Sequence, residues 1–147
     1  MARFSFSLQA VLNFRQAKEN QAKERLAGAL QLCRREEEIL ENYQNQLAEN
    51  LVPVPCGKLD LDRMVMGEQY CRSLEERIQV QTSRVLQAEK KVAVCRSQLE
   101  KARQELHMLE KLKEKKYGQY LYEENRREQL MLDDLALSRY RSKEDLL

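Results

Sequence analysis

The sequence predicts an all-α protein in which two long helices form an antiparallel coiled-coil hairpin, the second helix longer than the first. Three observations predict it. Glu, Lys, Arg, Gln, Leu and Ala dominate a 147-residue chain that is 34% charged, as is typical of long helices. Apolar side chains recur every seven residues in two blocks. Both prolines lie between the blocks, and a continuous helix cannot cross them. We expect one coiled-coil domain, residues 1–147.

The chain opens with an aromatic cluster, because its three phenylalanines, Phe4, Phe6 and Phe14, all lie near the N-terminus. Ser7 is a candidate N-cap for the first helix, and Phe6 and Val11 have the spacing of a hydrophobic staple. A staple uses Phe6 but leaves Phe4 and Phe14 needing other neighbours. We favour a binding tip for the group, with local packing as the alternative.

The first helix is expected over about residues 7–50, where the seven-residue repeat is sustained. One seam position holds Leu12, Leu26, Cys33, Leu40 and Leu47, with Glu19 as a polar interruption. The other seam position holds Leu8, Ala22, Ala29 and Tyr43.

A hinge is expected over about residues 51–59, and the second helix over about 60–141, with Asp60 or Asp62 as its N-cap. One of its seam positions recurs without a miss as Met64, Cys71, Ile78, Val85, Val92, Leu99 and Leu106. The partner position holds Leu74, Ala88, Cys95, Ala102 and Leu109, with Gly67 and Gln81 as weak members.

Folding the chain about Gly57 predicts which seam residues meet. Large residues then mostly face small ones, as a close-packed core requires. The expected pairs are Leu8 with Leu106, Leu12 with Ala102, Ala22 with Val92, Leu26 with Ala88, Ala29 with Val85, and Leu40 with Leu74. Four polar residues interrupt the seam and make this core thin: Arg15, Glu19, Glu36 and Gln81.

In this register, some forty residues of the second helix have no intramolecular partner. They remain amphipathic, because the repeat slips after Leu109 and resumes as Tyr117, Leu121, Met131 and Leu135. An apolar stripe kept without an internal partner indicates an external one. Three nearby rings, Tyr117, Tyr120 and Tyr122, fit a partner contact and local packing equally well.

Charge and cysteine usage argue against several binding functions. Acidic residues are interleaved with basic ones and the net charge is +2, so we expect no nucleic-acid partner. Four cysteines without a CxxC pair, and a single histidine, do not have zinc-site spacing, so reduced buried thiols are expected. No apolar run reaches the ~20 residues of a membrane span, which predicts a cytoplasmic protein without direct membrane insertion.

Catalysis has little support in the sequence. His107 has no positioned partner for general-base work, and adjacent Asp133 and Asp134 point about 100° apart on a helix. The chain has no glycine-rich phosphate loop and no hydrolase or zinc-protease motif. We expect neither an enzyme nor a cofactor.

Three stretches resemble the start, middle and end of the bacterial flagellar export protein FliJ, in order and at the expected separations. They are FSFSLQAVLNFR, CRSQLEKARQELHMLEKLKEKK and ENRREQLMLDDLALSRYRS. The matching positions are Phe4, Phe6, Leu8, Gln9, Val11, Leu12, Arg96, Leu99, Ala102, Leu109, Glu110, Glu128, Gln129, Leu132, Asp133, Asp134 and Ala136. At Asp134 the family more often has glutamate, which preserves the charge.

The resemblance implies a non-enzymatic stalk and chaperone of the flagellar type III export apparatus, serving flagellum biogenesis and motility. Family members are cytoplasmic antiparallel coiled coils similar to the rotary ATPase gamma subunit, peripherally associated with the membrane-embedded apparatus. Their partners are the hexameric export ATPase, whose ring assembly they promote, the cytoplasmic domain of the export gate, and export chaperones and substrates.

Carried onto this chain, the resemblance and the predicted shape give two candidate surfaces. The ATPase-binding tip comprises Phe4, Phe6, Leu8, Leu132, Asp133, Asp134 and Arg139. The residues expected to bind the export gate are chosen by their position near the hinge: Tyr43, Leu47, Tyr70 and Leu74. The alternatives are a self-associating coiled-coil scaffold, a substrate chaperone without ATPase contact, and a stalk protein of an injectisome.

Overall fold

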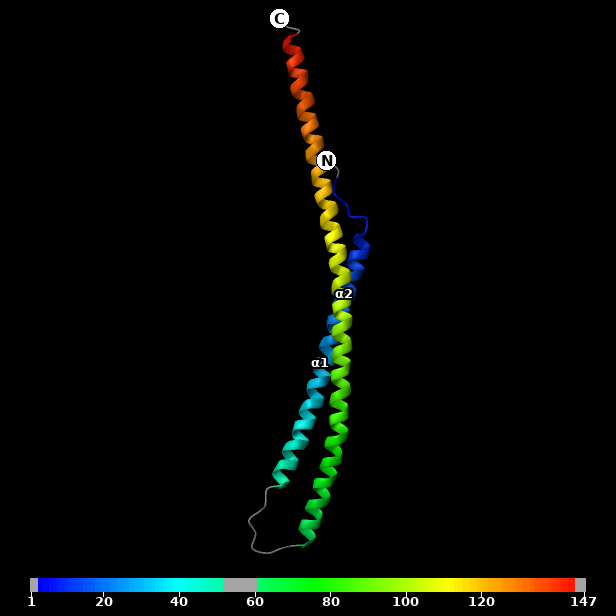
Figure 1. The fold of residues 1–147 in the computed structure, drawn as a ribbon, viewed down its shortest axis with the longest axis vertical. Coiled ribbons are helices and arrows are strands. Elements are labelled where there is room, and N and C mark those ends of the chain that lie inside the picture. Colours follow the sequence, from blue (N-terminus) through cyan, green and yellow to red (C-terminus); the bar gives the residue numbers. More distant parts are fainter. Residues whose placement is uncertain (1–2, 52–60, 145–147) are drawn as a thin grey trace. The chain divides into compact units, whose positions relative to one another are not determined.

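The computed structural model contains two helices, α1 (Gln9–Leu51) and α2 (Leu61–Glu144), which pack against each other (Figure 1). It describes residues 3–51 and 61–144, and side chains as far as residue 141. Within these ranges there is no strand, so the predicted all-α class with a longer second helix is confirmed. Apart from Leu51, the expected hinge lies outside the described residues, as does the candidate N-cap Asp60.

The chain divides into two compact units, each of which pairs a stretch of α1 with a stretch of α2. One comprises residues 18–102, and we call it the central unit. The other joins residues 1–17 to residues 103–147, and we call it the terminal unit. The expectation of a single domain stays a prediction.

The start of α1 differs from the predicted cap, whereas for α2 only one of the two predicted caps, Asp62, lies in the described residues. The first helical hydrogen bond of α1 runs from the backbone N–H of Leu12 to the carbonyl of Leu8, at 2.9 Å, so Leu8 rather than Ser7 is the N-cap. Phe6 does not staple the exposed Val11 but is buried with Leu12. Asp62 lies inside the first turn of α2, where its negative carboxylate interacts favourably with the partial positive charge at the N-terminal end of the helix dipole.

In the central unit, the partly or fully buried positions alternate by three and four residues on both helices. On α1 they run from Glu19 to Leu47, with one extra position at Leu30, and on α2 from Cys71 to Ala102, with one extra position at Ser73. This spacing confirms the predicted coiled-coil seam. Its best-buried cluster comprises Cys33, Ala88 and Val92, with Leu26, Ala29 and Leu30 packed against it. Met64 and Gly67 were predicted seam members, but every residue from 61 to 70 is exposed.

In the terminal unit, the core is a cluster of Phe6, Leu12 and Leu106, with Phe4 and Leu109 packed against it. The predicted pairs of Leu12 with Ala102 and of Leu8 with Leu106 are therefore wrong, because α1 meets α2 about one turn further along. Phe6 takes the place against Leu106, and Leu8 is exposed. The physical reason is that sliding one helix by about a turn still places apolar seam residues opposite each other, so the repeat alone does not fix the register.

Candidate partner-binding surfaces

The N-terminal segment is held against α2 by a cluster of three aromatic rings. The Phe4 ring meets Tyr117 nearly edge-on, with ring centroids 5.2 Å apart, and Tyr120 at a tilt, with centroids 5.5 Å apart. The two tyrosine rings stack with centroids 6.4 Å apart. Such pairs contribute about 0.5–1.5 kcal/mol each beyond their area burial. Local packing therefore accounts for Phe4, Phe6 and two of the three tyrosines, while Phe14 and Tyr122 remain exposed.

An ion pair also joins the two helices of the terminal unit. Arg15 donates from its guanidinium to the carboxylate of Glu105, and both side chains are partly exposed. Arg15 was predicted as a polar interruption of the seam. The structure gives it a partner on the opposite helix, so the seam is not simply broken at this layer.

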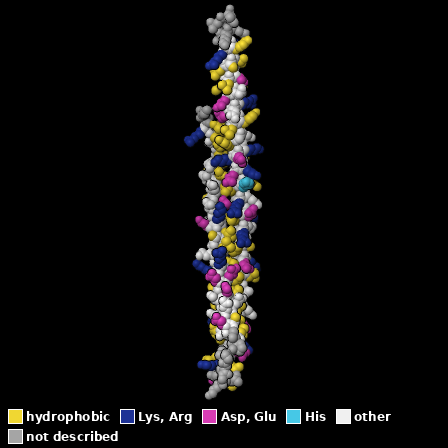
Figure 2. Space-filling model, turned by 90° about the vertical axis from the view of Figure 1, so that its left-hand side faces the viewer, with side chains coloured by type: hydrophobic (Ala, Val, Ile, Leu, Met, Phe, Trp, Pro, Cys, Tyr) yellow, Lys and Arg dark blue, Asp and Glu magenta, His cyan; other side chains and the backbone are white. Residues whose placement is uncertain are grey.

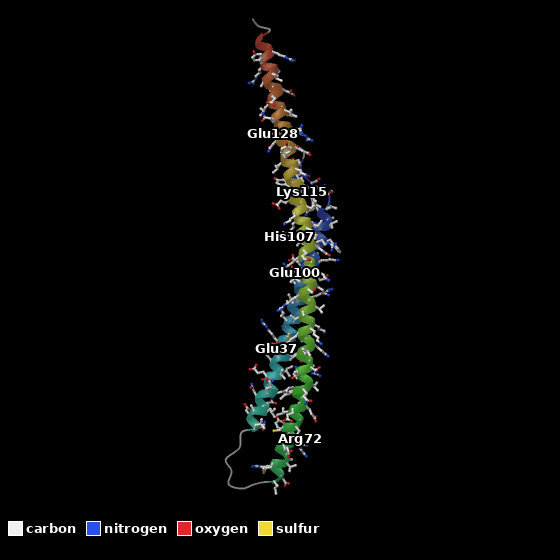
Figure 3. The ribbon with its side chains drawn as sticks, viewed as in Figure 1. Glu37, Arg72, Glu100, His107, Lys115 and Glu128 are labelled. Carbon is white, nitrogen blue, oxygen red and sulfur yellow. The ribbon has the colours of Figure 1, made fainter. Side chains whose placement is uncertain are left out.

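Beyond the aromatic cluster, the described part of α2 is exposed, and only Arg127 still lines a hollow with the N-terminal segment. Every residue from 125 to 141 is exposed, and Glu128 lies on this part of the helix (Figure 3). Six large apolar side chains are among them: Leu130, Met131, Leu132, Leu135, Leu137 and Tyr140. Hydrophobic side chains are visible at this end of the molecule in Figure 2. We call residues 125–141 the bare segment.

The predicted repeat in this part of α2 is wrong in detail. Among the residues after Leu109, burial continues at Lys113, Tyr120 and Glu124, and no slip is seen. Leu121 was expected to continue the stripe with Met131 and Leu135, but it is exposed, as those two are. The stripe that meets the N-terminal segment is thus carried partly by the stems of polar residues, which a hydrophobic repeat does not reveal.

The seven residues predicted for the ATPase-binding tip fall into two groups. Phe4 and Phe6 pack inward, and Leu8 caps α1 with its side chain partly exposed. The other four are Leu132, Asp133, Asp134 and Arg139, all exposed on the bare segment. The side-chain amide of Gln129 donates to Asp133 Oδ1 at 3.2 Å, which ties one carboxylate to its own helix.

The residues predicted to face the export gate lie in the central unit and differ widely in exposure. Tyr70 is exposed, whereas Tyr43 and Leu47 are half-buried at seam positions. Leu74 has 0% exposed surface and is fully enclosed. Tyr43 also lines a shallow hollow together with Arg77, Val80 and other α2 residues. Of the four, Tyr70 and Tyr43 are therefore the ones that a partner reaches without rearrangement.

The family described as the flagellar FliJ protein matches residues 4–145, nearly the whole chain. The chain belongs to the FliJ family. A comparison with curated proteins gave no match. The family assignment agrees with the two-helix coiled coil and makes this FliJ-family chain a component of the flagellar export apparatus.

FliJ proteins are non-catalytic, which confirms the prediction that this chain is not an enzyme. His107 lies exposed on α2 (Figure 3). In the parts of the chain that the structure describes, no group of three metal-ligating side chains comes together. No helix within those parts is long and apolar enough to cross a membrane.

Three cysteines of this FliJ-family chain fall in the described residues, and all are free thiols. Cys33 is buried in the central seam, and Cys71 and Cys95 are half-buried. Burial raises the pKa of the Cys33 thiol, and its hydrogen bond to Glu37 (Sγ to Oε1, 3.6 Å) and the negative charge of Glu37 raise it further. A thiol with a raised pKa is protonated and unreactive at neutral pH.

Sequence reasoning missed how the seam of this FliJ-family chain satisfies its buried polar residues. Gln81 is 2% exposed, and its amide donates to the backbone carbonyl of Glu36 at 2.9 Å and to the Glu36 carboxylate. Both residues were predicted as interruptions. One signal was present, since a glutamine and a glutamate at seam positions of facing helices can pair.

Proposed function

We propose that this FliJ-family chain is the stalk of the flagellar export ATPase. The bare segment binds the hexameric ring and promotes its assembly, and the central unit contacts the cytoplasmic domain of the export gate. The single observation that carries this proposal is the exposure of every residue from 125 to 141, six large apolar side chains among them. A surface of this kind is typical of a protein–protein contact.

The distribution of these side chains favours a partner that surrounds the helix. Leu130, Met131 and Leu132 are consecutive, so they point about 100° apart around the axis. A single partner helix covers one stripe, but a helix that is apolar on most sides is normally enclosed. The central opening of a ring provides such an enclosure. This argument also disfavours the alternative of a two-stranded self-association through the bare segment.

Within this proposal, the predicted tip residues act in two different ways. Leu132 provides apolar contact, and Asp133, Asp134 and Arg139 provide polar contacts to the ring. Phe4 and Phe6 position the N-terminal segment on α2, and Leu8 stays exposed at the start of α1. Their removal weakens ring binding indirectly.

The gate contact is assigned to Tyr70 and Tyr43, with Leu47 and the enclosed Leu74 supporting the helix pair behind them. Family resemblance supports this contact and the handling of export chaperones and substrates. It also supports a cytoplasmic location, peripheral to the membrane-embedded apparatus.

The test is binding of the full chain to its cognate export ATPase, with the double substitution Leu132→Ser and Leu135→Ser. We expect about tenfold weaker binding, loss of ring assembly in sedimentation and loss of any stimulation of ATP hydrolysis. Leu86→Ser is the matched control, because Leu86 is similarly exposed on α2 but lies in the central unit.

Two results would contradict the proposal. One is wild-type binding and ring assembly by the double variant. The other is a tight dimer of the free chain at micromolar concentration that the double variant abolishes, which would identify the bare segment as a self-association surface.

A further inference from the structure

Along the middle of the central unit, acidic residues are absent from one flank of the helix pair. In residues 25–46 of α1 and 73–101 of α2, every position on one flank of the seam is basic, apolar or uncharged polar. Its basic members are Arg25, Arg35, Arg77, Arg84, Lys91 and Lys101. Apart from Glu36 in the seam, every acidic residue of these stretches lies on the other flank or on the outer face. We call the acid-free side the basic flank.

The seam positions define which residues share this flank. Each helix has one flank next to one of its two seam positions, the position that holds Glu36 and Tyr43 on α1 and Gln81 and Ala88 on α2. Because the two helices run antiparallel, these two flanks lie on the same side of the helix pair. A shallow hollow on this side confirms the arrangement, since Tyr43 of α1 lines it together with Arg77 and Arg84 of α2. Glu76 reaches the rim of this hollow from the outer face.

The basic flank lacks the ion pairs that normally accompany such positions in coiled coils. Residues beside a seam usually carry opposite charges that pair between helices. Here Arg77, Arg84 and Lys91 are exposed and make no ion pair or hydrogen bond with any residue that the structure describes. Basic side chains of both helices therefore face solvent together, which favours an acidic partner on this side.

Apolar side chains alternate with these charges. Leu32 and Ile39 of α1 and Val80 and Val94 of α2 lie on the basic flank, and each is at least 39% exposed. The phosphate backbone of a nucleic acid does not bury such aliphatic side chains, whereas a third helix would bury them against its own apolar seam. Arg77, Arg84 and Lys91 recur every seven residues, or about 10.5 Å along α2.

We propose that the basic flank docks an amphipathic helix of another protein whose apolar seam is bordered by acidic residues at seven-residue spacing. The occupant lies along α1 and α2 as a third helix. Its leucine-like residues cover Leu32, Ile39 and Val80, and its carboxylates pair with Arg77, Arg84 and Lys91. This inference goes beyond the proposed binding of the ATPase ring and uses no residue of the bare segment. It shares Tyr43 with the proposed gate contact, because Tyr43 lines the hollow on the basic flank.

The test uses a designed helical peptide of about four heptads, with leucine and alanine in its seam and glutamate on both borders. Its binding to the full chain is measured by fluorescence anisotropy. The test variant is the triple substitution Arg77→Glu, Arg84→Glu and Lys91→Glu. The control is Arg34→Glu, Lys90→Glu and Arg96→Glu, which reverses the same number of charges off the basic flank.

We expect the test variant to bind the peptide about tenfold or more weakly and the control variant to bind it within about twofold of the unchanged chain. Circular dichroism should show the same helicity for all three proteins. A scrambled peptide of identical composition should bind at least about tenfold more weakly, since charge without an apolar seam is insufficient.

Three results would overturn the proposal. The first is equal weakening by both triple variants, which would indicate non-specific attraction. The second is equal binding of the scrambled peptide. The third is binding of duplex DNA that is as tight as binding of the peptide and competes with it, which would identify the basic flank as a nucleic-acid-binding surface. None of these involves the ATPase, so the stalk function stands or falls separately.

Discussion

The Phe4 ring meets the Tyr117 ring edge-on, with their centroids 5.2 Å apart and their planes at 69°. Phe4 precedes α1, and Tyr117 lies in the second half of α2, so this contact fixes the N-terminal segment within the terminal unit. Phe4 then also touches Tyr120. Aromatic pairing thus accounts for Phe4, and burial against Leu12 and Leu106 accounts for Phe6.

Replacing Phe4 with alanine should release the N-terminal segment without unfolding the central unit. The expected cost is about 1–2 kcal/mol of local stability, from lost ring contacts and lost burial. Hydrogen exchange of the backbone amides of residues 4–12 would measure it as faster exchange. Phe14→Ala is the control, because that ring is 56% exposed. Equal acceleration by the two substitutions would refute the role given to Phe4.

The hydrogen bond between Gln81 and Glu36 should show strong coupling between the two residues. Gln81→Leu alone leaves a half-buried carboxylate without its partner and should cost about 1–3 kcal/mol in the free energy of unfolding. Adding Glu36→Leu should recover most of that loss, since replacing both partners by apolar groups is often neutral. Urea denaturation of the four proteins of this double-mutant cycle measures the coupling. Additive effects would mean that the two side chains do not interact.

Leucines on α2 should divide into those that support the fold and those that do not. Leu106→Ala empties part of the cluster with Phe6 and Leu12 and should cost about 2–4 kcal/mol. Leu135→Ala on the bare segment should change stability by less than about 0.5 kcal/mol. Thermal unfolding followed by circular dichroism compares them. A comparable loss at Leu135 would show that the bare segment is covered in solution.

The Cys33 thiol should react more slowly with alkylating reagents at neutral pH than the half-buried Cys71. Burial and Glu37 raise the Cys33 pKa, so its thiolate fraction is small and grows only under alkaline conditions. Because the folded-state pKa is above the unfolded one, this group's contribution to stability is present below the unfolded pKa and is lost as pH rises through the folded pKa.

Glu37→Gln removes the negative charge near Cys33 and should shift the onset of alkylation to lower pH. Mass spectrometry of peptides alkylated across a pH series measures both cysteines in one experiment. An unchanged pH profile for Cys33 in the Glu37→Gln protein would refute the electrostatic part of this account.

The candidate sites were only partly visible in the sequence. The exposed group around Leu132 was found because an apolar stripe outlasted its internal partner. Leu74 was a seam residue by its spacing, and the structure buries it completely, so the same repeat that predicted the fold argued against its direct contact with a partner. The inward packing of Phe4 and Phe6 was weighed as an alternative, but choosing it required knowing that Tyr117 lies within reach.

The sequence by itself determined the two helices and the central seam. These properties depend on residues a few positions apart, and a seven-residue repeat encodes them independently of contacts between distant parts of the chain. Only the tertiary structure decided which turn of α1 meets which turn of α2. A coiled coil that slides by one turn keeps much of its apolar matching, so local periodicity leaves the register nearly undetermined. Contacts between residues far apart in the chain settled it, through the Phe4–Tyr117 rings and the Arg15–Glu105 ion pair.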